Sequence, residues 1–189
     1  MTEAHLLEPF LPRGARLLLL GSFPPKPERW SMNFYYPNWQ NDMWRIFGLA
    51  FFSDKDFFAD IPSRKFREAE IKKFLRSKKI AVADSAQAVV RKMGNASDAH
   101  LQVVKPLDIF AALEKIPNCQ NIAATGQKAL ETILKSVNAP APAIGEFSLF
   151  EHGGKECRLF RMPSSSRAYP MPLAKKAEHY RRMFEICGI

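Results

Sequence analysis

Four short apolar runs recur along the chain, with helical patterns between them. They cover residues 16–21, 79–84, 121–125 and 157–162. Short apolar runs without polar alternation are typical of strands buried on both faces, as in parallel sheets. Parallel strands need long crossover connections, which are usually helical. The pattern therefore predicts an α/β fold, a three-layer α/β/α sandwich around a small, mainly parallel four-stranded sheet.

The connections between these runs carry apolar residues at helical spacing. The expected helices cover residues 63–78, 109–116, 130–137 and 173–184, the first with a less regular apolar stripe. Asp108 is suited to cap one of these helices, and Pro172 is suited to the first turn of the last. We find no internal repeat, low-complexity tract or linker, so residues 1–189 are expected to form one domain.

The composition favours a cytoplasmic protein that acts without a cofactor. Hydrophobic residues make up 47% of the 189 residues, which is enough for a sizeable core. No apolar run reaches the roughly 20 residues that span a membrane, and the N-terminus has no signal-like segment. The three cysteines and four histidines are scattered, which argues against disulfides and metal sites: Cys119, Cys157, Cys187, His5, His100, His152 and His179. We expect each histidine to be exposed or hydrogen-bonded, and the protein to be a monomer with no metal and no membrane contact.

The formal net charge of +9 and the isoelectric point near 9.6 indicate a polyanionic partner. Nucleic acid is the leading class, because basic surfaces attract phosphate backbones. The alternative is a lysine-rich surface that is merely solvated, in which case the basic residues in the run 64–79 form the outer face of a helix.

The segment 17–44 reads LLLLGSFPPKPERWSMNFYYPNWQNDMW and predicts a binding pocket. A buried strand ends at Gly21, a proline-rich loop follows, and a helix opens near Asn41. Five aromatic residues fall within eleven positions: Phe34, Tyr35, Tyr36, Trp39 and Trp44. Open α/β sheets bind ligands where strands end and helices begin, so a flat ligand could stack here. The alternative is a satellite core beneath a long loop.

The last apolar run ends in MPSSSRAYPMP, which carries Ser164, Ser165, Ser166 and Arg167. Hydroxyls, backbone amides and an arginine before a helix are suited to a phosphate backbone. Ordinary capping of the next helix is the alternative. Because the first and last strands end at the same edge of a parallel sheet, both motifs can face one ligand.

Together these motifs resemble the uracil-DNA glycosylase superfamily, and most of all its mismatch-specific and hypoxanthine-DNA glycosylase branches. Those branches have Gly-Ser-x-Pro or Gly-Ile-Asn-Pro at a strand end, then an aromatic loop, an Asn-x-Phe-Trp helix opening, a strand-glycine-helix step and a Pro-Ser motif on the DNA-penetrating loop. The matching segments are Gly21-Ser22-Phe23-Pro24, Tyr35-Tyr36, Asn41-Asp42-Met43-Trp44, Thr125-Gly126 with Ala129, and Pro163-Ser164-Ser165-Ser166. The resemblance covers the chain from about residue 16 to residue 184.

The resemblance implies a monofunctional DNA glycosylase that hydrolyses the N-glycosidic bond of a flipped, deaminated base, uracil or hypoxanthine, in DNA repair. Asn41 and Ser22 become the catalytic candidates. The implied base-binding residues are Phe23, Tyr35, Tyr36 and Asn38, and the implied DNA-binding residues are Ser164, Ser165, Ser166 and Arg167.

The sequence departs from the pattern of the superfamily at four places. Ser22 follows the glycine where several branches have a water-activating Asp, Asn or Glu, although a serine there is similar to the hypoxanthine branch. Asn38-Trp39 replaces a common His-Pro pair, Met43 replaces Phe, and Arg167 lies near the place where relatives often have a leucine or another wedge residue. Asp42 and Asp84 are the alternative water-activating carboxylates. A nucleic-acid binder of the same fold without catalysis is the first alternative function. A small-nucleotide enzyme is the second, although no Walker or GxGxxG motif is present.

Overall fold

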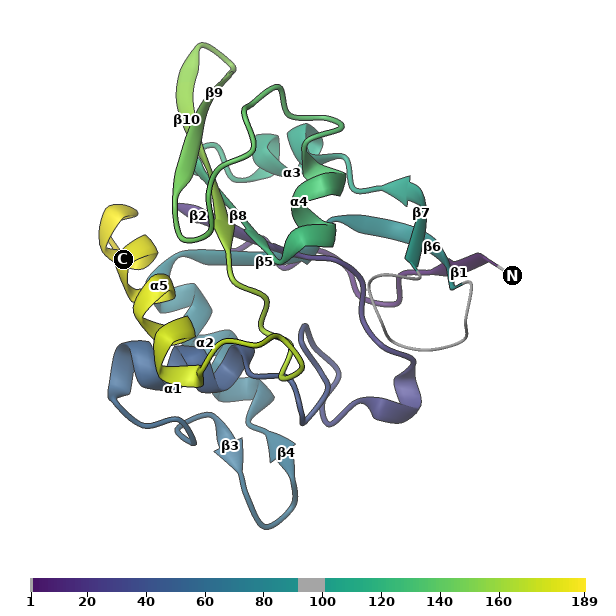
Figure 1. Cartoon of the computed structure of the whole chain (residues 1–189), viewed down its shortest axis with the longest axis vertical. Helices are drawn as coiled ribbons and strands as arrows, with labels where there is room; N and C mark the ends of the chain where they lie inside the picture. The colour runs from purple at the N-terminus through teal and green to yellow at the C-terminus, as the bar shows by residue number, and fades with distance from the viewer. Residues whose placement is uncertain (1, 92–100) are drawn as a thin grey trace.

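A computed structural model of the chain describes residues 2–91 and 101–189, and a five-stranded sheet runs through its centre (Figure 1). Its strands, in spatial order, are β5 (Ile80–Asp84), β2 (Leu17–Gly21), β8 (Asn121–Thr125), β10 (Lys155–Met162) and β9 (Phe147–His152). The first four are parallel, and β9 is antiparallel to β10. The α/β class and the four expected strands are confirmed, whereas the expected size of four strands is wrong.

The apolar runs became strands because helices cover both of their faces. Every residue of β2, β5 and β8 is buried. Their register places Gly21 opposite Asp84, and Met162 of β10 opposite Thr125. The carboxyl ends of the four parallel strands are therefore level with one another along one edge of the sheet.

The fifth strand, β9, was not predicted because it lies at an edge of the sheet. In β9 only Phe150 is buried, and Phe147 and Leu149 are exposed. An edge strand that faces solvent has no continuous apolar run. It pairs with β10 through a hairpin closed by Gly153 and Gly154, both with positive φ.

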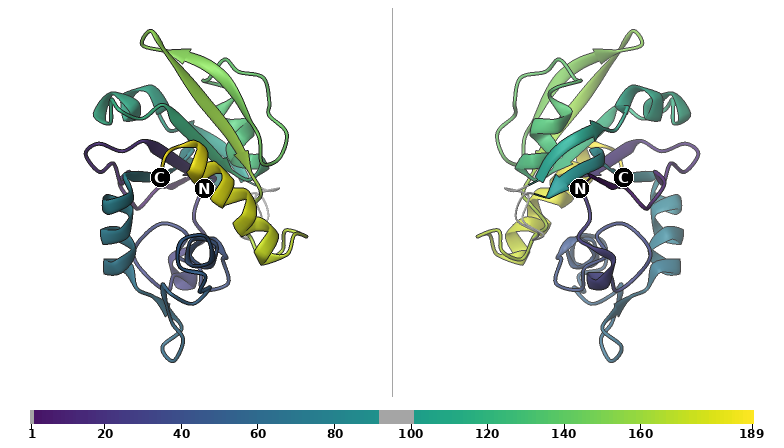
Figure 2. Two further views of the ribbon diagram at one scale, coloured as in Figure 1. Left: turned by 90° about the vertical axis from the view of Figure 1, so that its left-hand side faces the viewer. Right: turned by 90° about the vertical axis from the view of Figure 1, so that its right-hand side faces the viewer.

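Helices cover the two faces of the sheet as expected (Figures 1 and 2). One face carries α1 (Met43–Phe52), α2 (Glu68–Lys78) and α5 (Leu173–Ile186), and the other carries α3 (Ile109–Lys115) and α4 (Gln127–Ile133). The cap expected at the start of α3 is present, because the Asp108 side chain accepts a hydrogen bond from the Ala111 amide at 3.0 Å.

The expectation of a helix over residues 63–78 is only partly correct. Helix α2 begins at Glu68, and a short hairpin of β3 (Ala59–Asp60) and β4 (Lys65–Phe66) precedes it. Pro62 lies in the hairpin turn, where Arg64 has a positive φ of 52°. A turn of this kind interrupts a helix, and the basic residues of α2 itself lie mainly on its solvent side.

A second, three-stranded sheet was not anticipated from the sequence. It consists of β1 (Thr2–Ala4), β6 (Ala86–Arg91) and β7 (Leu101–Pro106), in the order β1-β6-β7. Strand β6 follows β5 after a single residue, Ser85. The expectation for His100 falls outside the described residues. The small sheet brings the N-terminal segment against the carboxyl end of β5.

The three cysteines are buried and unpaired. Burial raises the pKa of Cys119 and of Cys187 to about 12, so both thiols remain protonated at neutral pH. Within the described residues, no helix has the length and apolar character needed to cross a membrane.

The packing between α1 and the segment that follows it gives a first prediction. A Cβ placed on Gly48 would lie 2.2 Å from the backbone oxygen of Asp54, which cannot move as a side chain could. Gly48→Ala should therefore lower the free energy of unfolding by about 1–3 kcal/mol, as overpacking does. Helix propensity alone would raise the free energy of unfolding by about 1 kcal/mol. The sign of the change in chemical denaturation therefore distinguishes overpacking from helix propensity.

Candidate active site

A cavity of about 700 Å³ opens at the carboxyl ends of β2, β5 and β8. Its walls come from the loop after β2, the segment before α1 and the serine–arginine loop (residues 163–170) after β10. The lining residues are Gly21, Ser22, Phe23, Pro24, Pro25, Arg29, Tyr36, Pro37, Asn38, Gln40, Asn41, Asp84, Thr125, Ser164, Ser165, Ser166, Arg167, Ala168, Tyr169 and Pro170. The two motifs predicted to share a ligand therefore do face the same space.

Gly21 is required at the floor of the cavity because two polar groups approach it closely. A Cβ on Gly21 would lie 2.2 Å from the Asp84 carboxylate and 3.2 Å from the Tyr36 hydroxyl. The neighbouring Ser22 is half-buried and lines the cavity, as does Phe23. The absence of a side chain on Gly21 thus leaves room for the Asp84 carboxylate of the neighbouring strand β5.

Asp84 is the one carboxylate among the described residues that line the cavity. It ends β5, its side chain is 8% exposed, and its Oδ2 lies 2.8 Å from Nε2 of His5. Sequence reasoning named Asp84 only as an alternative, and took His5 as one scattered histidine. His5 agrees with the expectation that each histidine is exposed or hydrogen-bonded.

The aromatic cluster divides between the cavity and the core. Tyr36 lines the cavity, whereas Phe34, Tyr35 and Trp44 are buried beneath the loop. The Tyr35 hydroxyl donates to the Glu8 carbonyl at 3.0 Å, and the Trp44 indole donates to the Tyr35 carbonyl at 3.1 Å. Tyr35 does not line this cavity and its side chain is almost fully buried, so the geometry gives no support to its assignment to base binding. The alternative of a core beneath the loop fits Phe34, Tyr35 and Trp44, which belong to the main hydrophobic core and not to a satellite.

Tyr36 is held rigidly in the cavity wall. Its φ of 52° lies in the left-handed region, and its hydroxyl is 2.8 Å from the Thr125 hydroxyl. The Thr125 hydroxyl in turn donates to the Leu20 carbonyl at 3.2 Å. Burial, and next the negative charge of Asp84, raise the pKa of Tyr36 well above its ordinary value. Its phenol therefore remains neutral and available as a hydrogen-bonding group at physiological pH.

Asn41 and Asn38 both line the cavity, and both shape the loop that carries them. Oδ1 of Asn41 accepts a hydrogen bond from the Met43 amide at 2.9 Å, at the start of α1. Oδ1 of Asn38 accepts from the Gln40 amide at the same distance. Asn41 thus has a capping contact in addition to its place in the cavity.

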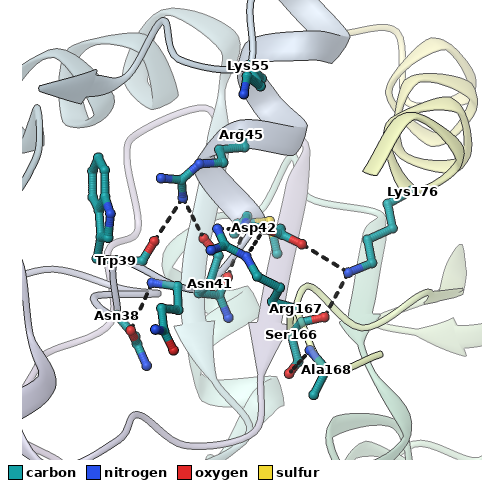
Figure 3. Close-up of polar contacts among 12 residues, drawn as sticks. Asn38, Trp39, Asn41, Asp42, Arg45, Lys55, Ser166, Arg167, Ala168 and Lys176 are labelled. Atoms are coloured by element: carbon teal, nitrogen blue, oxygen red, sulfur yellow. Dashed lines mark hydrogen bonds and ion pairs between the residues drawn. The ribbon is translucent and has the colours of Figure 1, made fainter. Parts of the chain in front are cut away.

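Asp42, the other alternative carboxylate, does not line this cavity, and Figure 3 shows its two cationic partners, Arg167 and Lys176. Oδ2 accepts from the ammonium group of Lys176 at 3.2 Å, and Oδ1 accepts from the guanidinium group of Arg167 at 3.3 Å. Lys176 also donates to the Ser166 carbonyl at 2.7 Å, although its side chain is only 1% exposed. Two cations therefore neutralise Asp42, which makes it a structural group.

The serine–arginine loop is folded by its own hydroxyls. Oγ of Ser164 accepts from the Ser166 amide at 3.2 Å, and Oγ of Ser166 accepts from the Ala168 amide at 3.3 Å. Ser165 is buried, and its carbonyl accepts from the Asp42 amide at 2.9 Å. Ser166 and Arg167 are exposed at the rim, where they are accessible to a large ligand.

A second hollow of about 620 Å³ adjoins the first and shares Arg167 with it. It contains Arg45, which donates to the Trp39 carbonyl at 2.9 Å and the Asn41 carbonyl at 3.2 Å (Figure 3). The Arg45 guanidinium carbon also lies 4.5 Å from the centre of the Trp39 ring. Arg45 therefore fixes the loop that presents Asn41.

In residues 2–91 and 101–189, no three His, Cys, Asp or Glu side chains are grouped to hold a metal ion.

Comparison of folds identifies a similar solved structure, the solution NMR structure of a proposed uracil DNA glycosylase from Methanosarcina acetivorans. The TM-score is 0.66, the sequence identity is 21%, and the match covers 100% of both chains. The chain shares the fold of that protein. No protein-family model and no curated protein sequence matches the chain.

Three residues that build the site were missed or undervalued by sequence reasoning. His5 lies far from the motifs in sequence, and Lys176 was not singled out at all. Thr125 was noted at a strand end, but its contact with Tyr36 was not. The sequence around a lysine or histidine does not show that its side chain is buried when the neighbouring apolar residues form an ordinary amphipathic pattern.

The Asp42–Lys176 pair gives the second prediction. Lys176→Met should lower the free energy of unfolding by about 3–5 kcal/mol, because removing one partner of a buried pair leaves a poorly compensated charge. The matched control is Lys175→Met, since Lys175 is 65% exposed and pairs with Glu178 at the surface. That change should stay within about 1 kcal/mol. Equal effects of the two substitutions in chemical denaturation would contradict a role for the buried pair.

Proposed function

We propose that this chain is a monofunctional DNA glycosylase that removes a flipped deaminated base, uracil or hypoxanthine, from DNA. The observation that carries the proposal is the cavity at the carboxyl ends of the strands, in which Ser22, Tyr36 and Asn41 meet the serine–arginine loop. The fold shared with a proposed uracil DNA glycosylase supports it. Enzymes that act on a base in duplex DNA must extrude it into such a cavity.

The cavity wall offers the contacts that a flipped base needs. Tyr36 and Phe23 provide aromatic surface for stacking, and their positions are fixed by neighbouring contacts. The backbone at Ser22 and the Asn38 side chain are proposed to meet the polar edge of the base. The volume of about 700 Å³ is in the range of ordinary small-molecule sites, which supports a purine as well as a pyrimidine ligand.

The chemistry proposed is dissociative hydrolysis of the N-glycosidic bond. Positive charge develops on the sugar and negative charge on the departing base, so fixed dipoles and charges accelerate the step. Asn41 is proposed to orient water or to stabilise the developing charge, with Ser22 beside it. An amide is a poor general base, and Asp84 supplies the carboxylate that can activate water.

The lining of the cavity also supports the monofunctional assignment. A glycosylase that cleaves the DNA strand through a covalent intermediate needs an amine nucleophile, and no described lining residue is a lysine. Lys176 is close to the loop, but its ammonium group is held by Asp42 and the Ser166 carbonyl. Water is therefore the proposed nucleophile.

A nucleic-acid binder without catalysis remains the second candidate, and Ser22 is the observation that favours it. Several branches of the superfamily have a water-activating side chain at this position. The two candidates differ in base release from duplexes that contain uracil, hypoxanthine, xanthine or a mismatched base, followed by cleavage at abasic sites. Release from at least one duplex supports the glycosylase, whereas binding to DNA without any release supports the binder.

The third prediction tests Asn41. Asn41→Ala should slow single-turnover base release by about 100-fold or more, as the loss of one preorganised donor does. It should also lower stability by about 1 kcal/mol, because the contact with the Met43 amide is lost. Asp108→Ala is the control: it removes a comparable contact, at the start of α3, and should leave base release unchanged. Normal release by Asn41→Ala would restrict Asn41 to capping.

The fourth prediction tests the DNA surface. Arg167→Ala should weaken DNA binding and reduce the dependence of log K on log salt by about 1, because one phosphate contact is lost. Arg182→Ala is the control, since Arg182 is also exposed and ion-paired but lies outside the cavity. Fluorescence anisotropy titrations at several salt concentrations measure both slopes. Equal slopes for the two variants would exclude Arg167 as a phosphate contact.

A further inference from the structure

We propose that His5 is a positioning residue for the reaction, which holds the Asp84 carboxylate in the cavity through a hydrogen bond from Nε2. This inference rests on the proposed glycosylase function. The two atoms lie 2.8 Å apart, and each side chain is 8% exposed. His5 itself does not line the cavity, so it acts through Asp84.

The surroundings of His5 determine which ring nitrogen carries the hydrogen. An ionised carboxylate can only accept, so Nε2 must donate. On the other side of the ring, the Leu7 amide lies 3.0 Å from Nδ1, and the Leu7 carbonyl lies 2.9 Å from it. The Leu7 amide can donate to Nδ1 when the ring is neutral with its hydrogen on Nε2. The Leu7 carbonyl can accept from Nδ1 when the ring is protonated. In both states Nε2 donates to Asp84.

The second sheet delivers His5 to this position. His5 follows β1, and its amide donates to the Gln87 carbonyl in β6 at 2.8 Å. The centre of its ring lies 5.1 Å from that of Phe23, edge to face, and 5.8 Å from that of Tyr35. Backbone pairing and ring packing therefore fix the imidazole before substrate binds.

This arrangement defines the orientation of the carboxylate. One oxygen of Asp84 is bound by His5, and the other lies toward Gly21 on the cavity floor. A buried carboxylate that loses its donor is left with an unsatisfied oxygen, which favours rotation toward another partner. Such a rotation removes the acceptor from the place where water or the base would meet it.

Two substitutions separate the hydrogen bond from the packing of the ring. His5→Gln places an amide NH₂ where Nε2 lies but removes the ring, whereas His5→Phe keeps the ring and removes the donor. We expect base release at saturating DNA to fall by about 10-fold to 100-fold in His5→Phe, as small misplacements of reacting groups do. We expect His5→Gln to remain within a few-fold of the wild type, and DNA affinity to be unchanged in both.

A double-mutant cycle and a stability measurement complete the test. Asp84→Ala should abolish the effect of His5→Phe, so that the double variant releases base no more slowly than Asp84→Ala alone. Thermal unfolding shows whether each variant is folded at the assay temperature. The inference would be overturned if the decrease in base release of each variant matched its decrease in thermal stability. It would also be overturned if His5→Phe were as active as the wild type.

A direct measurement keeps this inference separate from the proposed function. The ¹⁵N shifts of the His5 ring report which nitrogen is protonated, and they should show Nε2–H in the wild type and change in Asp84→Asn. This result with an inactive wild type would contradict the glycosylase function and leave the pair intact. A ring with its only hydrogen on Nδ1 would overturn the pair, whatever the activity of the protein.

Discussion

The buried contact between Lys176 and Asp42 joins the two halves of the site. Asp42 belongs to the segment that opens α1, whereas Lys176 lies in α5, 134 residues later in the chain. The same ammonium group binds the Ser166 carbonyl, and the Asp42 amide donates to the Ser165 carbonyl. The serine–arginine loop is thereby fixed against the segment that carries Asn41. Together with the backbone bridge between Asn41 and Ser166, these contacts hold the two motifs on either side of one cavity.

The sequence was most informative where burial and backbone geometry act together. Strands β2, β5 and β8 are apolar throughout because both of their faces are covered, so their positions could be predicted. Strand β9 and the sheet β1-β6-β7 have exposed residues and no continuous apolar run. Their pairing depends on contacts between distant segments, which a local pattern does not contain.

The candidate site was predictable to a similar extent and for similar reasons. Ser22, Phe23, Asn38 and Asn41 line the cavity because they follow a strand whose end could be located in the sequence. Tyr35 does not, because adjacent side chains in a loop can point in opposite directions. The partner of Asp84 could not be predicted either, since His5 reaches it through a second sheet and 79 residues separate the two.

The two buried aspartates have different surroundings, and this difference bears on the residue at position 22. Asp42 binds two cations, Lys176 and Arg167, whereas Asp84 is bound by the His5 imidazole through one oxygen and directs the other toward the cavity floor. Asp84 and Gly21 are opposite one another in register, and the carboxylate reaches the space beside Gly21 from the neighbouring strand. In the proposed reaction, a carboxylate at this place can perform the task that the residue after the glycine has in several branches of the uracil-DNA glycosylase superfamily. The proposed hydrolysis is therefore compatible with a serine at position 22.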